Sequence, residues 1–204
     1  MTPEPRRSTL DASGLPDVVF SSKNVNWWGT LSFMTIEGAT LAVCAAAYLY
    51  LRRNFVTWPP PPVPLPDLLV PTVNLVLILL VMVPLRYVHR ASYRRDIARV
   101  RIGFLVATAM SLVVTVLRYF ELRALNVRWD ESAYGSVAWL VVGAHATLLI
   151  VDLFETGVLA VLSHTSKWEE KHFSDAEDAA LYQYFLSLVW VPLYFLVYFS
   201  PRWL

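Results

Sequence analysis

Four ionisable side chains stand inside stretches of this sequence that are otherwise apolar. Glu37 lies near the middle of the run WWGTLSFMTIEGATLAVCAAAYLYLRR (27–53), and His145, Asp152 and Glu155 share a second apolar run further along the chain. An acid or an imidazole in an apolar medium is costly unless it has a partner or faces a polar cavity, so such residues commonly carry protons, bind ions or join helices. These four side chains are therefore the first candidates for chemistry.

The spacing of the second group places its members along one side of a helix. His145 and Asp152 are seven residues apart and share a face, while Glu155 lies about 80° round from His145. At about 1.5 Å per residue, Glu37 and Asp152 both lie roughly 15 Å from the same end of their helices, Glu155 at about 10 Å and His145 at about 25 Å. We expect the carboxyl groups of Glu37 and Asp152 at one level.

Two interpretations of this polar stripe stay open. In the first, the carboxyl groups share or relay a proton, because two acids in a medium of low dielectric constant cannot both be ionised. In the second, the same groups form hydrogen bonds between helices, or dock on another subunit, with one or more of the acids neutral.

Sites for metals and haem fit the stripe less well. The repeated Glu-x-x-His spacing of di-iron helix bundles is absent. A bis-histidine haem site would need two imidazoles that face each other, whereas the other histidines, His89, His164 and His172, lie at the ends of apolar runs. We expect no metal, no haem and no other redox cofactor in this chain.

Other function classes also lack their sequence signatures. There is no Ser-His-Asp arrangement, no phosphate-binding glycine loop and no dinucleotide fingerprint, so we expect no catalytic nucleophile. A single cysteine, Cys44, excludes a disulfide within the chain and a thiolate cluster. The formal net charge of +1 is too small for an electrostatic nucleic-acid footprint, so we expect no nucleic-acid partner.

The elements that must position these side chains are membrane-spanning helices. Hydrophobic residues make up 56% of the 204 residues and charged residues only 16%, which is typical of a membrane protein. The predicted fold is an all-α membrane protein with a polar cytoplasmic tail at 1–26 and a five-helix transmembrane bundle at 27–204. Its spans, each able to cross roughly 30 Å of hydrocarbon, cover about 27–51, 68–88, 102–122, 134–162 and 179–200.

The segments between the spans predict the orientation. The first connector, NFVTWPPPPVPLPD (54–67), is too rich in proline to be helical. Eleven of the 17 lysine and arginine residues belong to the tail and to the loops on its side, above all to RYVHRASYRRDIARVR (86–101). This bias predicts a cytoplasmic N-terminus and, after five spans, a C-terminus on the outside. Near the end of the third span, Arg118 is close enough to the interface to snorkel, so one interpretation of Arg118 and Glu121 is that they are anchors at the membrane rim. Glu121 is also a candidate for the group of buried polar residues.

A further set of aromatic and basic residues is expected to contact lipid or another subunit. Aromatic belts and the positive-inside bias account for such residues without any specific ligand. The set consists of Trp27, Trp28, Trp58, Arg86, Arg90 and Trp190.

Several segments, taken together and in order, resemble subunit III of the haem-copper oxygen reductases, the cytochrome c oxidase subunit III family, in a five-span form. The run that holds Glu37 is similar to the family's opening helix with its buried glutamate, and WPPPPVPLPDLLVPTVNLVLILL (58–80) to its Trp-Pro connector and Pro-x-x-Asn helix. LRYFELRAL (117–125) resembles its Gln-x-x-Glu helix end, with Glu121 on the glutamate.

The last two spans resemble the family as well. YGSVAWLVVGAHATLL (134–149) is similar to its Tyr-Gly-Ser and Gly-x-His segment, with His145 on the first histidine. AEDAALYQYFLSLVWVPLYFLVY (176–198) is similar to its final helix, in which Glu177, Tyr182, Phe185 and Trp190 are in place. Four polar positions of the family differ here: they hold Arg118, Leu148, Tyr184 and Ser187, whereas Asp152 and Glu155 are additions of this chain.

The resemblance implies a non-catalytic subunit of a proton-translocating terminal oxidase that reduces O2 to water in aerobic respiration. It implies subunits I and II of the oxidase as partners, haem and copper in the catalytic partner, bound phospholipid, a contribution to proton uptake, and a place in a bacterial inner membrane. Glu37, Glu121 and His145 would be the inherited polar residues.

Two other functions remain as alternatives. Within the same superfamily, the chain could be an accessory subunit of a nitric oxide reductase. From another class, it could be a small transporter or proton channel, which would need a water-accessible path along the stripe from both sides. No inverted repeat that would favour a transporter is evident in the sequence.

Overall fold

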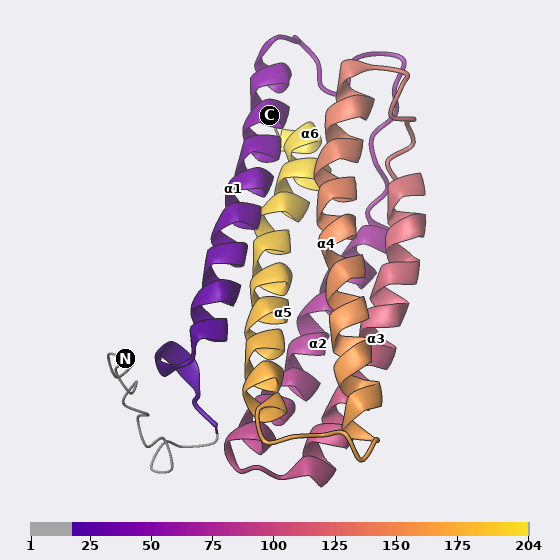
Figure 1. Cartoon of the computed structure of the whole chain (residues 1–204). Helices are drawn as coiled ribbons and strands as arrows, with labels where there is room; N and C mark the ends of the chain where they lie inside the picture. Colours follow the sequence, from indigo (N-terminus) through magenta and orange to yellow (C-terminus); the bar gives the residue numbers. More distant parts are fainter. Residues whose placement is uncertain (1–17, 204) are drawn as a thin grey trace, which may run out of the picture.

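The computed structural model describes residues 18–203, and this part of the chain is helical with no strand. Its five long helices run up and down side by side, so that α1 begins at one end of the bundle and the last helix finishes at the other (Figure 1). These helices are α1 (Val25–Arg53), α2 (Leu69–Tyr93), α3 (Ile97–Arg123), α4 (Ala133–Ser163) and α5 (His172–Tyr194). A short turn, η1 (Ser21–Lys23), precedes α1, and α5 continues through η2 (Phe195–Phe199) into α6 (Ser200–Trp203).

Within the described residues, all five long helices are long and apolar enough to cross a membrane. Their outward faces carry large apolar side chains, for example Val43, Val83 and Phe154, which are 69%, 66% and 76% exposed. A water-soluble protein rarely exposes so many apolar side chains over one continuous surface, because water makes that exposure costly. The protein is therefore an all-α integral membrane protein.

The helices extend beyond the expected spans where the chain is polar. α2 continues to Tyr93 and α3 begins at Ile97, so most of the basic segment 86–101 is helical instead of forming a loop. The Asp96 side chain accepts a hydrogen bond from the Arg99 backbone N–H and caps α3. Similarly, α5 begins at His172, seven residues before the expected span. Hydropathy marks only the part of a helix that suits hydrocarbon, whereas backbone hydrogen bonds continue into the polar ends.

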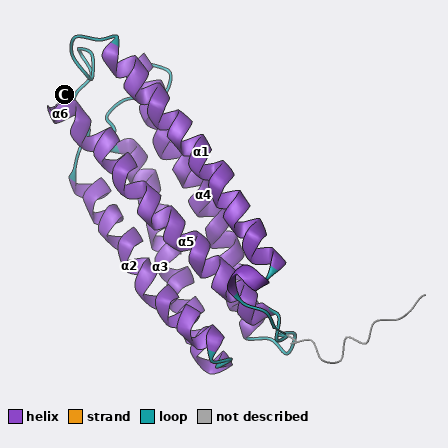
Figure 2. Ribbon diagram, turned by 90° about the vertical axis from the view of Figure 1, so that its left-hand side faces the viewer, coloured by secondary structure: helices purple, strands orange, loops and turns teal. Residues whose placement is uncertain are grey.

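The helix α5 is the most buried of the five, with half of its apolar stretch inside the molecule. It packs against α1, α2 and α4, while α3 packs between α2 and α4, and α1 against α4. Figure 2 shows these long helices from the side, with all loops at the two ends of the bundle. A side chain on α5 can consequently meet partners from three other helices.

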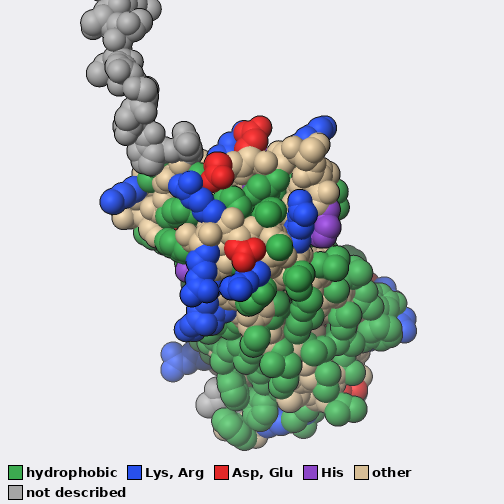
Figure 3. Space-filling model, turned by 90° about the horizontal axis from the view of Figure 1, so that it is seen from below, with side chains coloured by type: hydrophobic (Ala, Val, Ile, Leu, Met, Phe, Trp, Pro, Cys, Tyr) green, Lys and Arg blue, Asp and Glu red, His purple; other side chains and the backbone are tan. Residues whose placement is uncertain are grey.

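Of the two ends of the bundle, the end at which α1 begins carries more basic residues within the described part of the chain. Figure 3 shows this end, where lysine and arginine side chains gather together with a few acids, while apolar side chains dominate the flank. Of the expected tail 1–26, residues 1–17 lie outside the described range. Val18 is buried against the bundle, and the Ser21 backbone N–H and hydroxyl both donate to Glu177 of α5.

At the opposite end, the proline-rich connector folds back onto the bundle. Trp58 is only 5% exposed, donates from Nε1 to the Tyr48 hydroxyl over 2.9 Å, and packs edge-on against Tyr134 of α4. Trp58 therefore lies inside the chain, and not at a lipid or subunit contact as expected. The physical reason is that the connector returns its indole towards the Tyr48 hydroxyl, which accepts the N–H away from water.

Candidate functional site

A buried ion pair on α3 forms the centre of the first polar network. Arg118 and Glu121, one helical turn apart, are 2% and 0% exposed, and Arg118 Nη1 donates to Glu121 Oε2 over 2.8 Å. Asn74 of α2 donates to the same oxygen from Nδ2 over 2.7 Å. Glu121 is thus buried, as expected of an inherited polar residue, whereas the interpretation of Arg118 as an anchor at the membrane rim was wrong. Arg118 points into the bundle, where a carboxylate and an amide partner are available.

His145 joins this network from α4. Arg118 Nη2 donates to His145 Nδ1 over 3.2 Å, and His145 Nε2 lies 3.0 Å from the backbone oxygen of Leu186 on α5. A guanidinium has donors only and a carbonyl oxygen accepts only, so Nδ1 must be the acceptor and Nε2 must carry the proton. His145 is thus a neutral imidazole that connects α3 to α5.

Trp190 closes the network on α5. The Arg118 guanidinium carbon lies 3.9 Å from the centroid of the Trp190 ring, and the His145 and Trp190 rings are 4.6 Å apart. The Trp190 side chain is 0% exposed. It stabilises a buried cation through its ring face, and it does not reach lipid or another subunit as expected.

A second group of polar residues surrounds Glu37, towards the end at which α1 begins. The Tyr182 hydroxyl of α5 donates to Glu37 Oε2 over 2.7 Å. The neighbouring residue, Gln183, faces Asp152 of α4, and its amide nitrogen donates to the Asp152 carboxylate. Asp152 is 1% exposed. Adjacent residues of α5 therefore hold one acid from α1 and one from α4.

Glu155 connects this second group to the surface. Its side chain is exposed and lines a groove of about 280 Å³ together with Gly29, Phe33 and Tyr182. Tyr182 is thus shared between the groove and the Glu37 carboxylate. The Tyr182 side chain therefore connects the open groove to the buried carboxyl group of Glu37.

The start of α5 holds further acids that the sequence interpretation did not single out as a site. Glu177 accepts from the Tyr93 hydroxyl over 2.6 Å and from Ser21, which attaches the segment before α1 to α2 and α5. Asp178 is 6% exposed, and neither of its carboxylate oxygens has a hydrogen-bond partner within residues 18–203. The only sequence signal was the run of acids at the start of the last span.

The predicted polar stripe is therefore divided between two networks. His145 meets Arg118, the partner of Glu121, whereas Asp152 and Glu155 belong to the group around Glu37. His145 and Asp152 share a face of α4, but seven residues separate them by about 10 Å along the axis. Different residues of α3 and α5 face them at those two levels.

The remaining predicted contact residues lie on the surface. Trp27 is half-buried and packs edge-on against Trp28, which is 54% exposed. Arg86 and Arg90 are exposed and line a groove beside α5. Across residues 18–203, no group of three or more His, Cys, Asp or Glu side chains is arranged to hold a metal ion.

The fold and its polar interior define a class of protein: a multi-pass helical membrane protein whose buried charges are partnered chiefly by other helices of the same chain. The sequence model of the family described as Cytochrome c oxidase subunit III matches residues 34–202. The chain belongs to the cytochrome c oxidase subunit III family.

Curated relatives agree with this assignment. The cytochrome c oxidase subunit 3 of Synechocystis is 26% identical over 181 residues, which cover 86% of this chain and 76% of the relative. The protein of the same name from Thermostichus vulcanus is 23% identical and covers 85% and 87%. The probable cytochrome c oxidase subunit 3 of Mycobacterium tuberculosis is 29% identical over 175 residues and covers 84% and 86%.

Proposed function

We propose that this chain is the non-catalytic subunit III of a proton-translocating haem-copper terminal oxidase in a bacterial inner membrane. Subunits I and II are its partners, and the haem and copper belong to the catalytic partner. The family match over 34–202 is the observation that carries this proposal. The basic bundle end in Figure 3 supports a cytoplasmic position for the start of α1.

The first network supports a scaffolding role for the upper half of the bundle in Figure 1. Asn74, Arg118 and His145, with Glu121 and Leu186, link α2, α3, α4 and α5 through hydrogen bonds no longer than 3.2 Å. A buried set of charges and dipoles with this many partners fixes the rotation of each helix, because any slip leaves a charge unpaired. A rigid subunit of this kind can stabilise the catalytic subunit beside it.

The second network is where a contribution to proton uptake is best placed. Glu155 is exposed at a groove, Tyr182 lines that groove and donates to Glu37, and the buried Asp152 meets Gln183, the neighbour of Tyr182 on α5. Protonatable groups that lead from the surface into the interior can hold and pass a proton. The same groups also join α1, α4 and α5. A measurement of enzyme turnover is therefore needed to distinguish the proton relay from a purely structural connection between helices.

Purification through an affinity tag on this chain tests the proposal. We expect haem-copper partner subunits to co-purify, and the haem spectrum together with O2 consumption to identify a terminal oxidase. NO reduction by the isolated complex would instead favour an accessory subunit of a nitric oxide reductase. An isolated chain that moves protons across vesicles without any haem protein would favour the channel.

Deletion of the gene gives an independent check. The catalytic partner should then keep its full haem and copper content, since this chain is proposed to hold neither. A partner purified from the deletion strain with a missing haem or copper signal would contradict a cofactor-free subunit.

A further inference from the structure

The first half of α1 has little support from the rest of the bundle. Its stretch from Val25 to Ile36 contains no buried residue. The buried residues of α1 all follow this stretch: they are Glu37, Leu41, Cys44 and Tyr48. Packing against neighbouring helices normally determines where a helix lies. The position of this stretch therefore depends on what holds its two ends.

The inner end of the stretch is held by Glu37, which accepts a hydrogen bond from Tyr182 of α5 over 2.7 Å. The outer end is held by residues 18–24, which we call the strap. Within the strap, Ser21 has a φ of 55°. Residues other than glycine adopt this left-handed conformation only where their surroundings fix it. The contacts of the strap with the bundle supply that constraint.

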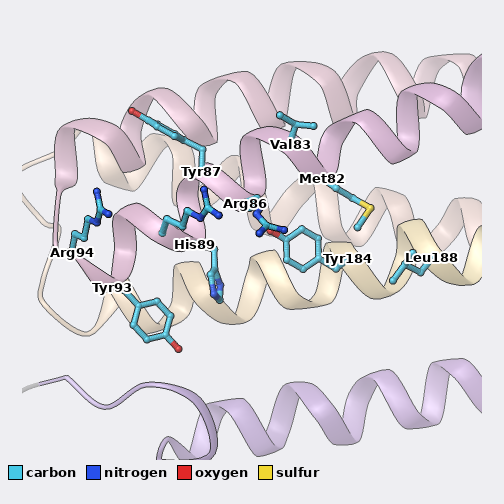
Figure 4. A pocket seen from close by; sticks show the side chains of 10 residues that line it. Met82, Val83, Arg86, Tyr87, His89, Tyr93, Arg94, Tyr184 and Leu188 are labelled. Atoms are coloured by element: carbon cyan, nitrogen blue, oxygen red, sulfur yellow. The ribbon is translucent and has the colours of Figure 1, made fainter.

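Glu177 of α5 is the main contact of the strap. Its carboxylate accepts from the Ser21 backbone N–H over 3.1 Å and from the Ser21 hydroxyl over 2.9 Å. It also accepts from the Tyr93 hydroxyl of α2 over 2.6 Å. Phe20 stacks on the Tyr93 ring with 4.7 Å between the centroids, and Figure 4 shows Tyr93 extending from the end of α2 towards this segment. One carboxylate and one aromatic stack thus attach the strap to α2 and α5.

The strap is also joined firmly to the first turn of α1. Trp28 Nε1 donates to the backbone oxygen of Ser22 over 2.9 Å. The Asn24 side chain accepts from the Asn26 backbone N–H over 3.0 Å and caps the helix. Figure 1 shows η1 directly before α1, which lies at the edge of the bundle. The strap and the start of α1 are therefore expected to move together.

The same stretch of α1 forms one wall of the groove that holds Glu155. Gly29, Thr30 and Phe33 line this wall, and Glu155 and Tyr182 line the groove from α4 and α5. A Cβ at Gly29 would have no atom within 4 Å, so the groove is open beside this residue. An outward movement of the start of α1 would widen the groove without breaking any buried contact of the stretch.

We propose that the strap sets the width of this groove, and that Glu177 is the positioning residue that holds the strap closed. With the strap attached, the start of α1 stays beside α4 and α5, and the groove keeps its volume of about 280 Å³. With the strap released, the start of α1 moves outward and water reaches Tyr182 and Glu37. This inference rests on the proposed function for the proton role of these residues, and it adds how their contact with water is controlled.

Labelling of a cysteine in the groove tests the inference in the complex purified through this chain. Thr30→Cys, in a Cys44→Ala background, places one thiol in the groove wall, and a water-soluble maleimide is the probe. Glu177→Ala releases the strap. Glu170→Ala is the matched control, because it removes an acid from the same end of the bundle whose partner is Arg95 and not the strap.

The rate of labelling gives the readout. We expect the Thr30→Cys thiol to react at least about tenfold faster when Glu177→Ala is added, because the loss of even one hydrogen bond to a charged group shifts an opening equilibrium by that factor. Glu170→Ala should leave the rate unchanged. Glu177→Gln keeps a carbonyl oxygen that can accept from the Ser21 and Tyr93 hydroxyls, so it should restore most of the slow rate.

A second variant keeps the test decisive if Glu177→Ala fails to accumulate. Phe20→Ala removes the stacking on Tyr93 without changing any charge or any residue of α5, and it should accelerate the labelling of Thr30→Cys in the same direction. An unchanged labelling rate in Glu177→Ala, or in Phe20→Ala if that is the variant obtained, overturns the proposal.

A reference thiol separates release of the strap from unfolding. Lys167→Cys lies in the exposed loop between α4 and α5, at the same end of the bundle, and should react at one rate in every variant. Faster labelling at this position as well would show that the whole bundle end unfolds, which also overturns a role confined to the strap.

The labelling test is separate from the test of function. Labelling is counted per copy of this chain, whether or not a haem protein co-purifies. Absence of haem would contradict the proposed function alone, and an unchanged labelling rate in a haem-containing complex would contradict this inference alone.

Discussion

The guanidinium of Arg118 on α3 lies over the indole of Trp190 on α5, with 3.9 Å between the guanidinium carbon and the ring centroid. On its other sides the same guanidinium donates to Glu121 and to His145. A full positive charge inside an apolar bundle is tolerable only with such partners, because desolvation of an isolated charge is very costly. This one contact therefore determines much of how α3, α4 and α5 face one another.

Replacement of Arg118 by leucine should strongly destabilise the chain. Glu121 would lose its cationic partner in a fully buried position and would keep only the hydrogen bond from Asn74 among the described residues. Breaking a buried pair in this way costs about 3–5 kcal/mol. We expect Arg118→Leu to lower the midpoint temperature at which the chain dissociates from the purified complex.

The double variant R118L/E121L should recover most of this loss, because it removes both charges together. Arg123→Leu, at an exposed position of the same helix, is the matched control and should leave the midpoint unchanged. A single variant as stable as the wild type would show that Glu121 does not depend on Arg118.

Substitutions at Glu37 separate packing from proton transfer. Glu37→Gln keeps a carbonyl oxygen that can accept from the Tyr182 hydroxyl, so we expect normal assembly, measured as the amount of this chain per haem. Glu37→Leu leaves that hydroxyl without its partner and should destabilise the chain by about 1–3 kcal/mol.

Turnover distinguishes the two roles of Glu37. If the carboxyl group contributes to proton uptake, E37Q should assemble fully and yet lower steady-state O2 reduction or shorten its duration. Unchanged turnover in a fully assembled E37Q complex would leave only the packing role. Loss of the chain from the E37Q complex would show that the charge itself is required.

Removal of the Tyr48 hydroxyl should weaken the connector end of the bundle. Trp58 Nε1–H donates to this hydroxyl in a buried position, and Tyr48→Phe leaves the indole N–H unpaired at a cost of about 1–3 kcal/mol. Tyr50→Phe is the control, since Tyr50 is 71% exposed on the same helix. Limited proteolysis in the connector should be faster in Y48F alone. Equal rates in both variants would argue against the role given to this hydrogen bond.

Gly135 should tolerate no side chain at the start of α4. A Cβ there would overlap the backbone carbonyl oxygen of Arg128, which cannot rotate away as a side chain can. Overpacking of this kind costs about 1–3 kcal/mol, so we expect Gly135→Ala to lower the yield of assembled complex and its thermal midpoint. Gly143→Ala on the same helix has open space around the new methyl group and should behave as the wild type. A G135A complex with wild-type yield would contradict this close approach.

Several features of the fold could be predicted from the sequence because they depend on local chemistry. Apolar runs of membrane length indicated five helices, which the structure confirms, and the ordered resemblance indicated the family, which the family match confirms. Polar helix ends were not predictable in this way. Backbone hydrogen bonding extends α2, α3 and α5 past the apolar stretch, where hydropathy carries no signal.

The partners of the buried residues were harder to predict. Glu37, Glu121, His145 and Asp152 were recognisable as polar residues in apolar surroundings, and all four are buried. Arg118 and Trp190, however, were placed at the periphery, because an arginine near a span end and an aromatic residue both fit the interface pattern. Their positions depend on which way α3 and α5 are rotated, and rotation is set by the packing of the other helices.

The sequence by itself therefore determined that the chain crosses a membrane five times, that acids stand inside those crossings, and which family it joins, since each follows from residue type and order along one dimension. Only the tertiary structure decided that His145 meets Arg118 while Asp152 meets Gln183. Those pairings require side chains from separate helices to coincide in both level and direction, and neither the level nor the rotation of one helix against another is encoded in any single stretch of residues.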